Sequence, residues 1–271
     1  MITKEAISAS TKINAWSKQW ALDNLDYLNS KNPLLGSSTK IEKGNSEKHF
    51  TKVLYLQPAD KVATTTLCAF ADGAGCKAPC LKGSGQLGMS IADNAATRKT
   101  ILMLVNPVEF YRRLRAEITT AYKKHGSTLS IRLNGTSDVD FGSFCASMPN
   151  VQFYEYTKIY ARVKKNTIAN LDLTYSGSAI SKKTIAMTAR AVNEGHRVAI
   201  AFNTAETKGE FKVPTDIASF DTTDLRFLDG AGLGSLKYKG GSKAKRAATM
   251  NQDDFFFTPE THKQLIKLIA I

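Results

Sequence analysis

The chain has 271 residues, of which 42% are hydrophobic and 23% charged, with 18 glycines and seven prolines. These fractions exclude wholesale disorder and collagen-like composition, and the length suits one large α/β domain or two small ones. Thirty-seven Lys and Arg residues against 24 Asp and Glu leave a net charge of +13. Such a field attracts polyanions, so the charge favours a nucleic-acid partner, although a basic protein without any ligand has the same composition.

Two features indicate a cytoplasmic protein. No apolar run approaches the roughly 18 to 20 residues that a membrane-spanning helix needs. Residues 1–10 are polar and lack the apolar core of a secretory signal. In a reducing compartment, closely spaced cysteines are more often metal ligands or reactive thiols than disulfides.

Residues 1 to about 50 predict a partly helical N-terminal arm. The stretch Ile13–Leu28 is amphipathic, with Trp16, Trp20 and Leu28 at helical spacing. Residues 30–50 have loop chemistry and no sustained period, which predicts a mobile connection. The division therefore places an arm at 1–50 and an α/β domain at 51–271.

Short apolar runs predict the strands of that domain. The strong runs are Val53–Gln57, Leu129–Asn134, Val151–Tyr156, Leu171–Tyr175 and Val198–Asn203, and the weaker ones are Leu225–Asp229 and Ser235–Tyr238. Helical patterns lie between them, from Pro107 to Gly126 and from Ser181 to Glu194, and a last one spans Pro259–Ile271. Strands alternating with helices predict a parallel-stranded α/β, (β/α) barrel-like domain, complete or incomplete. The Gly-rich dinucleotide-binding fingerprint is absent.

Polar residues follow the predicted strands, and the carboxyl ends of parallel strands form the edge at which ligands bind. The candidate catalytic residues are Asp138, Lys158 and Asp229, and the candidate anion-binding residues at strand ends are Arg132, Asn134, Ser176 and Arg226. Asp138, with Asp140, could serve as a base, nucleophile or magnesium ligand, or as a turn residue or cap. Lys158 could contact a phosphate, act as a base if buried, or be solvated.

Arg132 lies inside a predicted strand, where a lone cation is costly unless it is paired. A pair with Asp138 or Glu155 is the structural explanation, and an anionic substrate is the functional one.

A basic segment, residues 237–246, carries five cations and no anion. Its candidate nucleic-acid contacts are Lys237, Tyr238, Lys239, Lys243, Lys245 and Arg246. Cations around an aromatic ring suit single-stranded nucleic acid, which offers phosphates to pair and bases to stack. A solvated basic loop is the alternative.

Three cysteines, Cys68, Cys76 and Cys80, follow the first predicted strand with the spacing C-x7-C-x3-C, and Cys145 is distant. Small residues between them let the backbone bring the thiolates together, and thiolates select zinc or an iron–sulfur cluster. Three local ligands fit a [4Fe–4S] cluster with one open iron better than a four-ligand structural zinc site. Three reduced structural cysteines are the alternative.

This cysteine pattern, with the downstream Ala95–Thr100 segment (A-x-x-R-K-T), resembles the phage-encoded gene product 88 family. Further matching motifs lie at 132–138, 153–158, 173–176 and 224–229, in order along the chain. The resemblance implies a phage protein acting in the cytoplasm of the host cell. More distantly, three cysteines after a first strand are similar to radical-SAM barrels. The usual spacing in those barrels is C-x3-C-x2-C, and Pro79 stands here in place of their usual aromatic residue, so both departures argue against SAM binding.

Two functional hypotheses follow. In the first, the chain is an enzyme that acts on nucleic acid or a nucleotide, with a Cys68/Cys76/Cys80 metal centre at the mouth of the barrel. In the second, it is a non-catalytic single-stranded DNA- or RNA-binding protein with structural cysteines and stacking tyrosines. The candidate tyrosines are Tyr156, Tyr160 and Tyr238. A host or phage protein partner is compatible with the sequence but has no motif of its own.

Overall fold

The computed structural model describes residues 1–46, 48–77, 79–80, 85–202, 217–237 and 255–269. Its strands are β1 (Leu35–Gly36), β2 (Phe50–Leu54), β3 (Leu129–Arg132), β4 (Gln152–Thr157), β5 (Leu171–Ser176), β6 (Arg197–Phe202), β7 (Ala218–Ser219) and β8 (Gly232–Lys237). Its α-helices are α1 (Lys4–Ala9), α2 (Ala15–Asp23), α3 (Leu25–Leu28), α4 (Thr39–Gly44), α5 (Ser90–Val105), α6 (Pro107–His125), α7 (Gly142–Ala146), α8 (Tyr160–Lys165), α9 (Lys182–Asn193) and α11 (Pro259–Ile269). Short 3-10 helices are η2 (Gly85–Gly88), η3 (Gly126–Thr128) and η4 (Arg226–Leu228).

The strands form one sheet in the order β1-β2-β3-β4-β5-β6-β8-β7. The strands from β2 to β6 and then β8 are parallel, and only β1 pairs antiparallel within the described part of the chain. From β1 to β6, neighbouring strands therefore follow one another along the chain, as in (β/α) barrels, whereas β8 inserts between β6 and β7. The predicted parallel α/β architecture is confirmed, in an open form whose described edges are β1 and β7.

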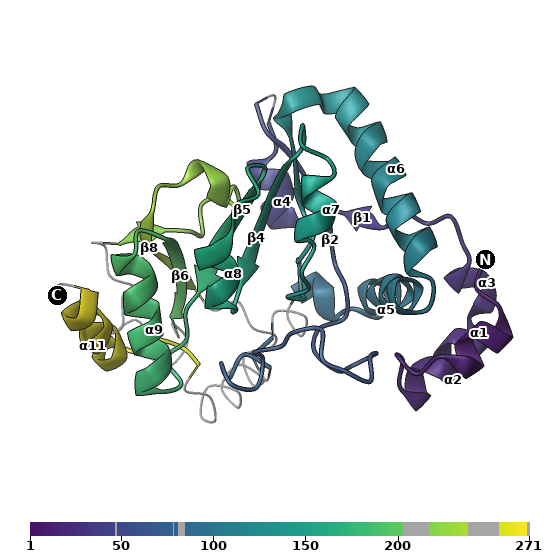
Figure 1. Cartoon of the computed structure of the whole chain (residues 1–271), viewed down its shortest axis with the longest axis horizontal. Coiled ribbons are helices and arrows are strands. Elements are labelled where there is room, and N and C mark those ends of the chain that lie inside the picture. Colours follow the sequence, from purple (N-terminus) through teal and green to yellow (C-terminus); the bar gives the residue numbers. More distant parts are fainter. Residues whose placement is uncertain (47, 78, 81–84, 203–216, 238–254, 270–271) are drawn as a thin grey trace.

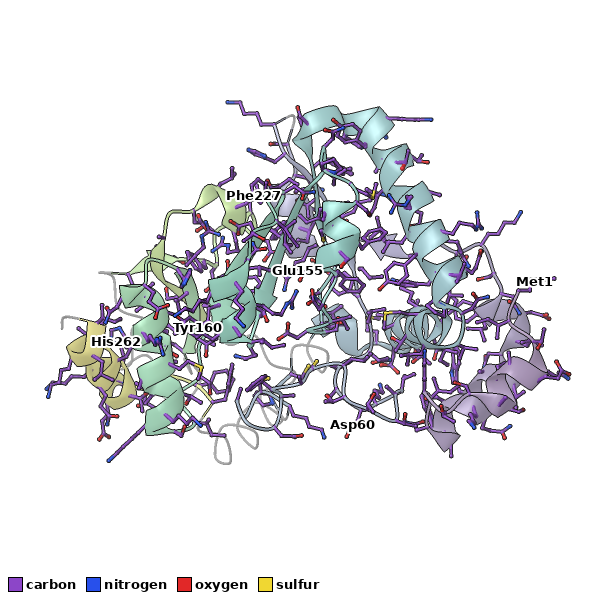
Figure 2. All side chains as sticks on the ribbon, viewed as in Figure 1. Met1, Asp60, Glu155, Tyr160, Phe227 and His262 are labelled. Carbon is purple, nitrogen blue, oxygen red and sulfur yellow. The ribbon has the colours of Figure 1, made fainter. Side chains whose placement is uncertain are left out.

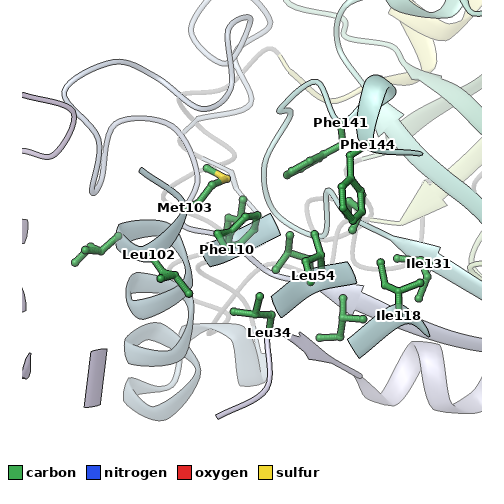
Figure 3. Close-up of a cluster of buried hydrophobic side chains, with 14 of the residues drawn as sticks. Leu34, Leu54, Leu102, Met103, Phe110, Ile118, Ile131, Phe141 and Phe144 are labelled. Carbon is green, nitrogen blue, oxygen red and sulfur yellow. The ribbon is translucent and has the colours of Figure 1, made fainter. Parts of the chain in front are cut away.

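Side chains along each strand point alternately to two faces of the sheet. One face packs against helices, and we call the other the inner face. In β4, Phe153 belongs to the large apolar cluster under α6, whereas Tyr154 contacts Phe227 of η4 on the other face. Figure 3 shows this cluster where Phe110 and Ile118 of α6 meet strand residues such as Ile131. The helices after β2 through β5 thus bury one face and leave the polar inner face for a site.

A second apolar cluster packs α9 and α11 against β5 and β6. Ser181 caps α9, because its hydroxyl accepts the Thr184 N–H while Thr184 bonds back to the Ser181 N–H. The helix begins and ends where its sequence pattern predicts, as does α6. In Figure 1, α11 and the group α1–α3 lie at opposite ends of the long axis of the molecule.

The N-terminal segment differs from its prediction in two details. The amphipathic stretch is broken at Asn24, which separates α2 from α3. Residues 30–50, predicted as a structureless connection, contain β1 and α4, and the carboxylate of Glu117 accepts the N–H groups of the buried Leu34 and Leu35. Leu28 and Leu34 share a buried cluster with the sheet. The division at residue 50 stays a prediction.

The prediction of a strand at Leu225–Asp229 is wrong. This segment holds η4, in which Arg226 and Asp229 form an ion pair of 3.1 Å at the i,i+3 spacing. One helical turn closes that distance, whereas an extended chain would separate the two residues by about 10 Å. The sheet continues instead with β8, close to the predicted Ser235–Tyr238. No helix among the described residues is long and apolar enough to cross a membrane.

Candidate functional site

A cavity of about 400 Å³ lies at the carboxyl ends of β3, β4, β5 and β8. The predicted site residues that line it are Cys68, Cys76, Cys80, Arg132, Asn134, Asp138, Lys158, Ser176 and Lys237. The structure thus brings together the cysteine segment and the strand-end residues. The other predicted contacts of the basic segment lie outside the described residues; they are Tyr238, Lys239, Lys243, Lys245 and Arg246.

The turn after β3 is built around the buried side chain of Asn134. Its amide donates to the Val139 carbonyl and to Glu155 Oε2, each at 2.8 Å. Its Oδ1 accepts hydrogen bonds from the Ser137 hydroxyl and the Val139 N–H. These bonds make Asn134 the residue that shapes the turn. Gly135 is required beside it, because a Cβ there would lie 2.6 Å from the Tyr55 ring.

Asp138 is held by protein donors on both carboxylate oxygens. Oδ1 accepts from the Arg162 guanidinium at 2.8 Å, and Oδ2 accepts from the Lys158 backbone N–H at 2.8 Å and the Thr157 hydroxyl at 3.1 Å. The carboxylate therefore positions the end of β4. Asp140 is exposed and accepts the Gly142 N–H at the start of α7.

Arg132 does not pair with either of its predicted partners. Arg162 of α8 binds both Asp138 and Glu155, the latter at 3.0 Å. Arg132 instead bonds to Asp224 at 2.8 Å, and its guanidinium lies 4.8 Å from the centre of the Tyr156 ring. Burial lowers the pKa of Arg132, but the charge of Asp224 together with the neighbouring tyrosines outweighs burial, and the net pKa is raised. The two residues of this pair are 92 positions apart in the sequence, so no local pattern could predict it.

Lys158 lies one residue beyond β4 and turns into the cavity. Its Nζ is 2.9 Å from Ser176 Oγ, 3.1 Å from the Ser176 carbonyl and 3.2 Å from the Gly177 carbonyl. The Phe255 ring covers the amine, with its centre 4.2 Å away. Burial lowers the pKa of Lys158 to about 8, against the opposing charges of Cys76 and Asp138. Lys158 is thus a half-buried amine held by hydrogen bonds, not a solvated loop lysine.

The cysteine segment lies at the carboxyl ends of the strands because hydrogen bonds join it to the loops that follow β3 and β5. The Asp138 N–H donates to the Leu67 carbonyl at 3.0 Å, and the Ser178 hydroxyl donates to the Ala74 carbonyl at 2.7 Å. Burial raises the pKa of Cys68 to about 11, and the neighbouring Cys80 acts in the same direction. In the described ranges, no three His, Cys, Asp or Glu side chains are close enough together to hold a metal ion.

Arg226 and Asp229 are not part of this cavity. The Asp229 carbonyl accepts a hydrogen bond from Arg197, the first residue of β6, so Asp229 lies at the amino-terminal edge of the sheet. The Arg226 guanidinium lies over the Phe220 ring instead. Their predicted place at the ligand edge depended on a strand ending at Asp229. Because η4 replaces that strand and precedes β8, Asp229 lies at the opposite edge.

Several lining residues were not predicted, and they come from segments far apart in the chain. They are Tyr55 after β2, Asp224 before η4, and Phe255 and Phe256 before α11. The three consecutive phenylalanines at 255–257 are a visible sequence feature, but their position over Lys158 depends on the chain returning after β8.

A family model described as Gene product 88 matches residues 28–252. The chain belongs to the Gene product 88 family. The resemblance found in its motifs is confirmed, and the match covers every described residue of the cavity from Ser38 to Lys237. This is a phage gene product family. Neither the search of curated proteins nor the search of solved structures found a match.

Proposed function

We propose that this Gene product 88 protein is an enzyme that binds a nucleotide, or one nucleotide unit of a single-stranded nucleic acid, in the strand-end cavity, in the cytoplasm of the phage host. One observation carries the proposal. Thiol, amine and amide groups from distant segments line a single cavity at the carboxyl edge of a parallel sheet. That edge is where α/β enzymes of this architecture bind their ligands.

The size and chemistry of the cavity fit such a ligand. Its volume of about 400 Å³ falls within the range of small-molecule sites. Lys237 is exposed beside it and can pair with a phosphate, and the rings of Tyr156 and Phe255 offer faces for a base. The net charge of +13 would draw a polyanion toward the molecule.

We also propose that the segment carrying Cys68, Cys76 and Cys80 closes on a [4Fe–4S] cluster or a zinc ion. The three thiols line the same cavity, and five of the seven residues between the first two are Ala or Gly. Their present arrangement does not meet metal-ligand geometry, so no chemical step is assigned to a metal. Anaerobic purification followed by iron, sulfide and zinc analysis tests this part. Metal-free protein with all four thiols titratable would contradict it.

Binding is tested by fluorescence anisotropy with labelled nucleotides and short single-stranded oligonucleotides at increasing salt. We expect the affinity to fall steeply with salt, because each paired phosphate releases counterions. Lys237→Glu should weaken binding by about tenfold and reduce the salt slope. Lys183→Glu, on the exposed face of α9, is the matched control with the same charge change. Equal losses in both variants would show that only the overall charge matters, and would contradict binding at the cavity.

The alternative is a binding protein without catalysis, and the basic sequence that continues directly from Lys237 favours it. Incubation of bound oligonucleotides and nucleotides with the protein, followed by mass spectrometry, separates the two. A ligand recovered unchanged, under conditions that saturate binding and with metal restored, would favour the binding protein.

A further inference from the structure

Two neighbouring strands place a serine and a lysine side by side in the cavity. In the β4–β5 ladder, Thr157 pairs with Tyr175. The next residue on each strand is Lys158 and Ser176, so both stand at the carboxyl edge. Side chains alternate along a strand, and Tyr175 packs into the apolar cluster under α9, which leaves Ser176 facing inward. Both residues line the cavity, so a ligand there can reach them.

The shortest contact of the lysine is with the serine hydroxyl. Nζ lies 2.9 Å from Ser176 Oγ, against 3.1 and 3.2 Å for the carbonyls of Ser176 and Gly177. A neutral amine has two hydrogens and one lone pair. It can therefore donate to both carbonyls and accept the hydroxyl proton, since the hydroxyl is the one partner of the three that can also donate.

We propose that Ser176 is a nucleophile and that Lys158 is its general base, forming a serine–lysine dyad that attacks the phosphorus of a phosphate ester. The class of electrophile rests on the proposed function, in which the ligand is a nucleotide or nucleic acid. The geometry of the dyad is independent of it. A hydroxyl is a weak nucleophile until a neighbouring base removes its proton, and a hydrogen bond of this length is the required arrangement.

The surroundings of Lys158 keep the amine available as a base. Burial under the Phe255 ring lowers its pKa to about 8, so a substantial fraction is neutral in mildly alkaline solution. The charged groups acting on it are Cys76 from the cysteine segment and Asp138 from the turn after β3. The Asp138 carboxylate accepts the Lys158 backbone N–H, which fixes where the side chain begins.

The Ser176 Oγ–H bond breaks and its proton passes to Lys158 Nζ while Oγ forms a bond to phosphorus. The bond from phosphorus to the leaving oxygen breaks, and the ammonium of Lys158 returns the proton to that oxygen. Water then attacks the phosphorus of the seryl phosphate ester and gives a proton to Lys158 Nζ. The bond from phosphorus to Ser176 Oγ breaks, and the ammonium of Lys158 gives that proton to Oγ, so the product leaves with the Ser176 hydroxyl and the neutral amine restored.

The test uses an alkyl fluorophosphonate on the full chain, with intact-mass and peptide mass spectrometry. We expect one adduct, on Ser176, formed with loss of fluoride at a rate that rises with pH and levels off above about 8. Ser176→Ala should form no adduct. Lys158→Arg keeps a cation but cannot act as a base, and should slow the reaction about a hundredfold or more. Ser235→Ala, at a buried β8 serine that does not line the cavity, is the control and should react like the native chain.

Several outcomes would overturn the dyad: no adduct on Ser176 in the folded native chain, a rate that does not change between pH 6 and 10, or equal labelling of Ser176→Ala. The pH profile of the native chain decides the matter even where Lys158→Arg does not fold. A second arm compares bis(4-nitrophenyl) phosphate with 4-nitrophenyl acetate. Release of 4-nitrophenolate from the acetate alone would overturn phosphorus as the electrophile.

The nucleotide-binding measurement separates this inference from the proposed function. Binding retained by Ser176→Ala, together with an unreactive native serine, would refute the dyad and leave the proposed function standing. A reactive Ser176 in a chain that binds no nucleotide would refute the proposed function and the phosphate substrate, and leave the dyad.

Discussion

At the residue scale, a buried charge network supports the floor of the cavity. Glu155 lies on the helix-packed side of β4, near the middle of the sheet (Figure 2), and is fully buried. Its Oε2 accepts hydrogen bonds from Asn134 and Arg162, whereas Oε1 has no partner among the described residues. Arg162 also holds Asp138, so one guanidinium joins the turn after β3 to the end of β4. This network is the reason that Asp138 is a positioning group.

Glu155 should make stability depend on pH. Burial raises its pKa from 4.5 to about 7 against the opposing charge of Arg162. Between these values the folded state binds more protons than the unfolded state, so the free energy of unfolding should fall as pH rises from about 4.5 to 7. Glu155→Gln keeps an acceptor for Asn134 but cannot titrate, and should flatten that part of the profile. Urea denaturation at a series of pH values measures it, and an unchanged slope would show that Glu155 does not titrate in this window.

At the element scale, β8 packs closely against the ring of Phe220 because its residue at that point, Gly234, has no side chain. A Cβ at Gly234 would overlap the ring of Phe220, and that ring is itself covered by the Arg226 guanidinium at 4.1 Å. The strand, the ring and the cation are therefore packed in layers on the inner face. The close approach explains why a glycine stands in the middle of a strand, where glycine otherwise weakens pairing.

Gly234→Ala should accordingly destabilise the fold by about 1 to 3 kcal/mol, because a buried ring must move to admit a methyl group. Gly230→Ala, where nothing lies within 4 Å of the added Cβ, is the matched control and should change stability little. Thermal and urea denaturation provide the comparison. Equal stability of the two variants would mean that Phe220 moves without cost.

At the scale of the whole molecule, the first helices are attached to the core of the sheet. Ile7 and Leu28 are fully buried and belong to the cluster that contains Leu54 of β2 and Ile131 of β3. The guanidinium of Arg98 in α5 adds polar contacts, donating to the carbonyls of Asn32 and Pro33. These contacts connect residues 1–50 with the sheet through both apolar and polar groups.

Leu28→Ala tests whether the segment unfolds together with the sheet. Removing a fully buried leucine side chain should cost about 2 to 5 kcal/mol of global stability and shift a single unfolding transition. Leu228→Ala, at a leucine that is 54% exposed, should have an effect below about 0.5 kcal/mol. Two separate transitions in Leu28→Ala, with the second unchanged from the native chain, would instead establish an independent arm.

The sequence alone was enough for the features that depend on nearby residues. The periodicity around Phe110, Leu114 and Ile118 predicted α6, and the apolar runs predicted the parallel strands. Polar residues at strand ends predicted the edge of the sheet at which the cavity lies, because parallel strands carry their carboxyl ends to one side. The cysteine spacing and the motifs downstream also identified the family.

Tertiary structure decided which of these residues meet and what each one binds. Arg132 found Asp224 rather than its near neighbours, and η4 moved Asp229 to the far edge of the sheet. The contact between Lys158 and Ser176 arises from strand register. The residues in such pairs are tens of positions apart in the sequence, and the packing of the whole sheet determines which of them meet. A local pattern depends only on neighbours along the chain, so it can mark reactive side chains but cannot say which of them touch.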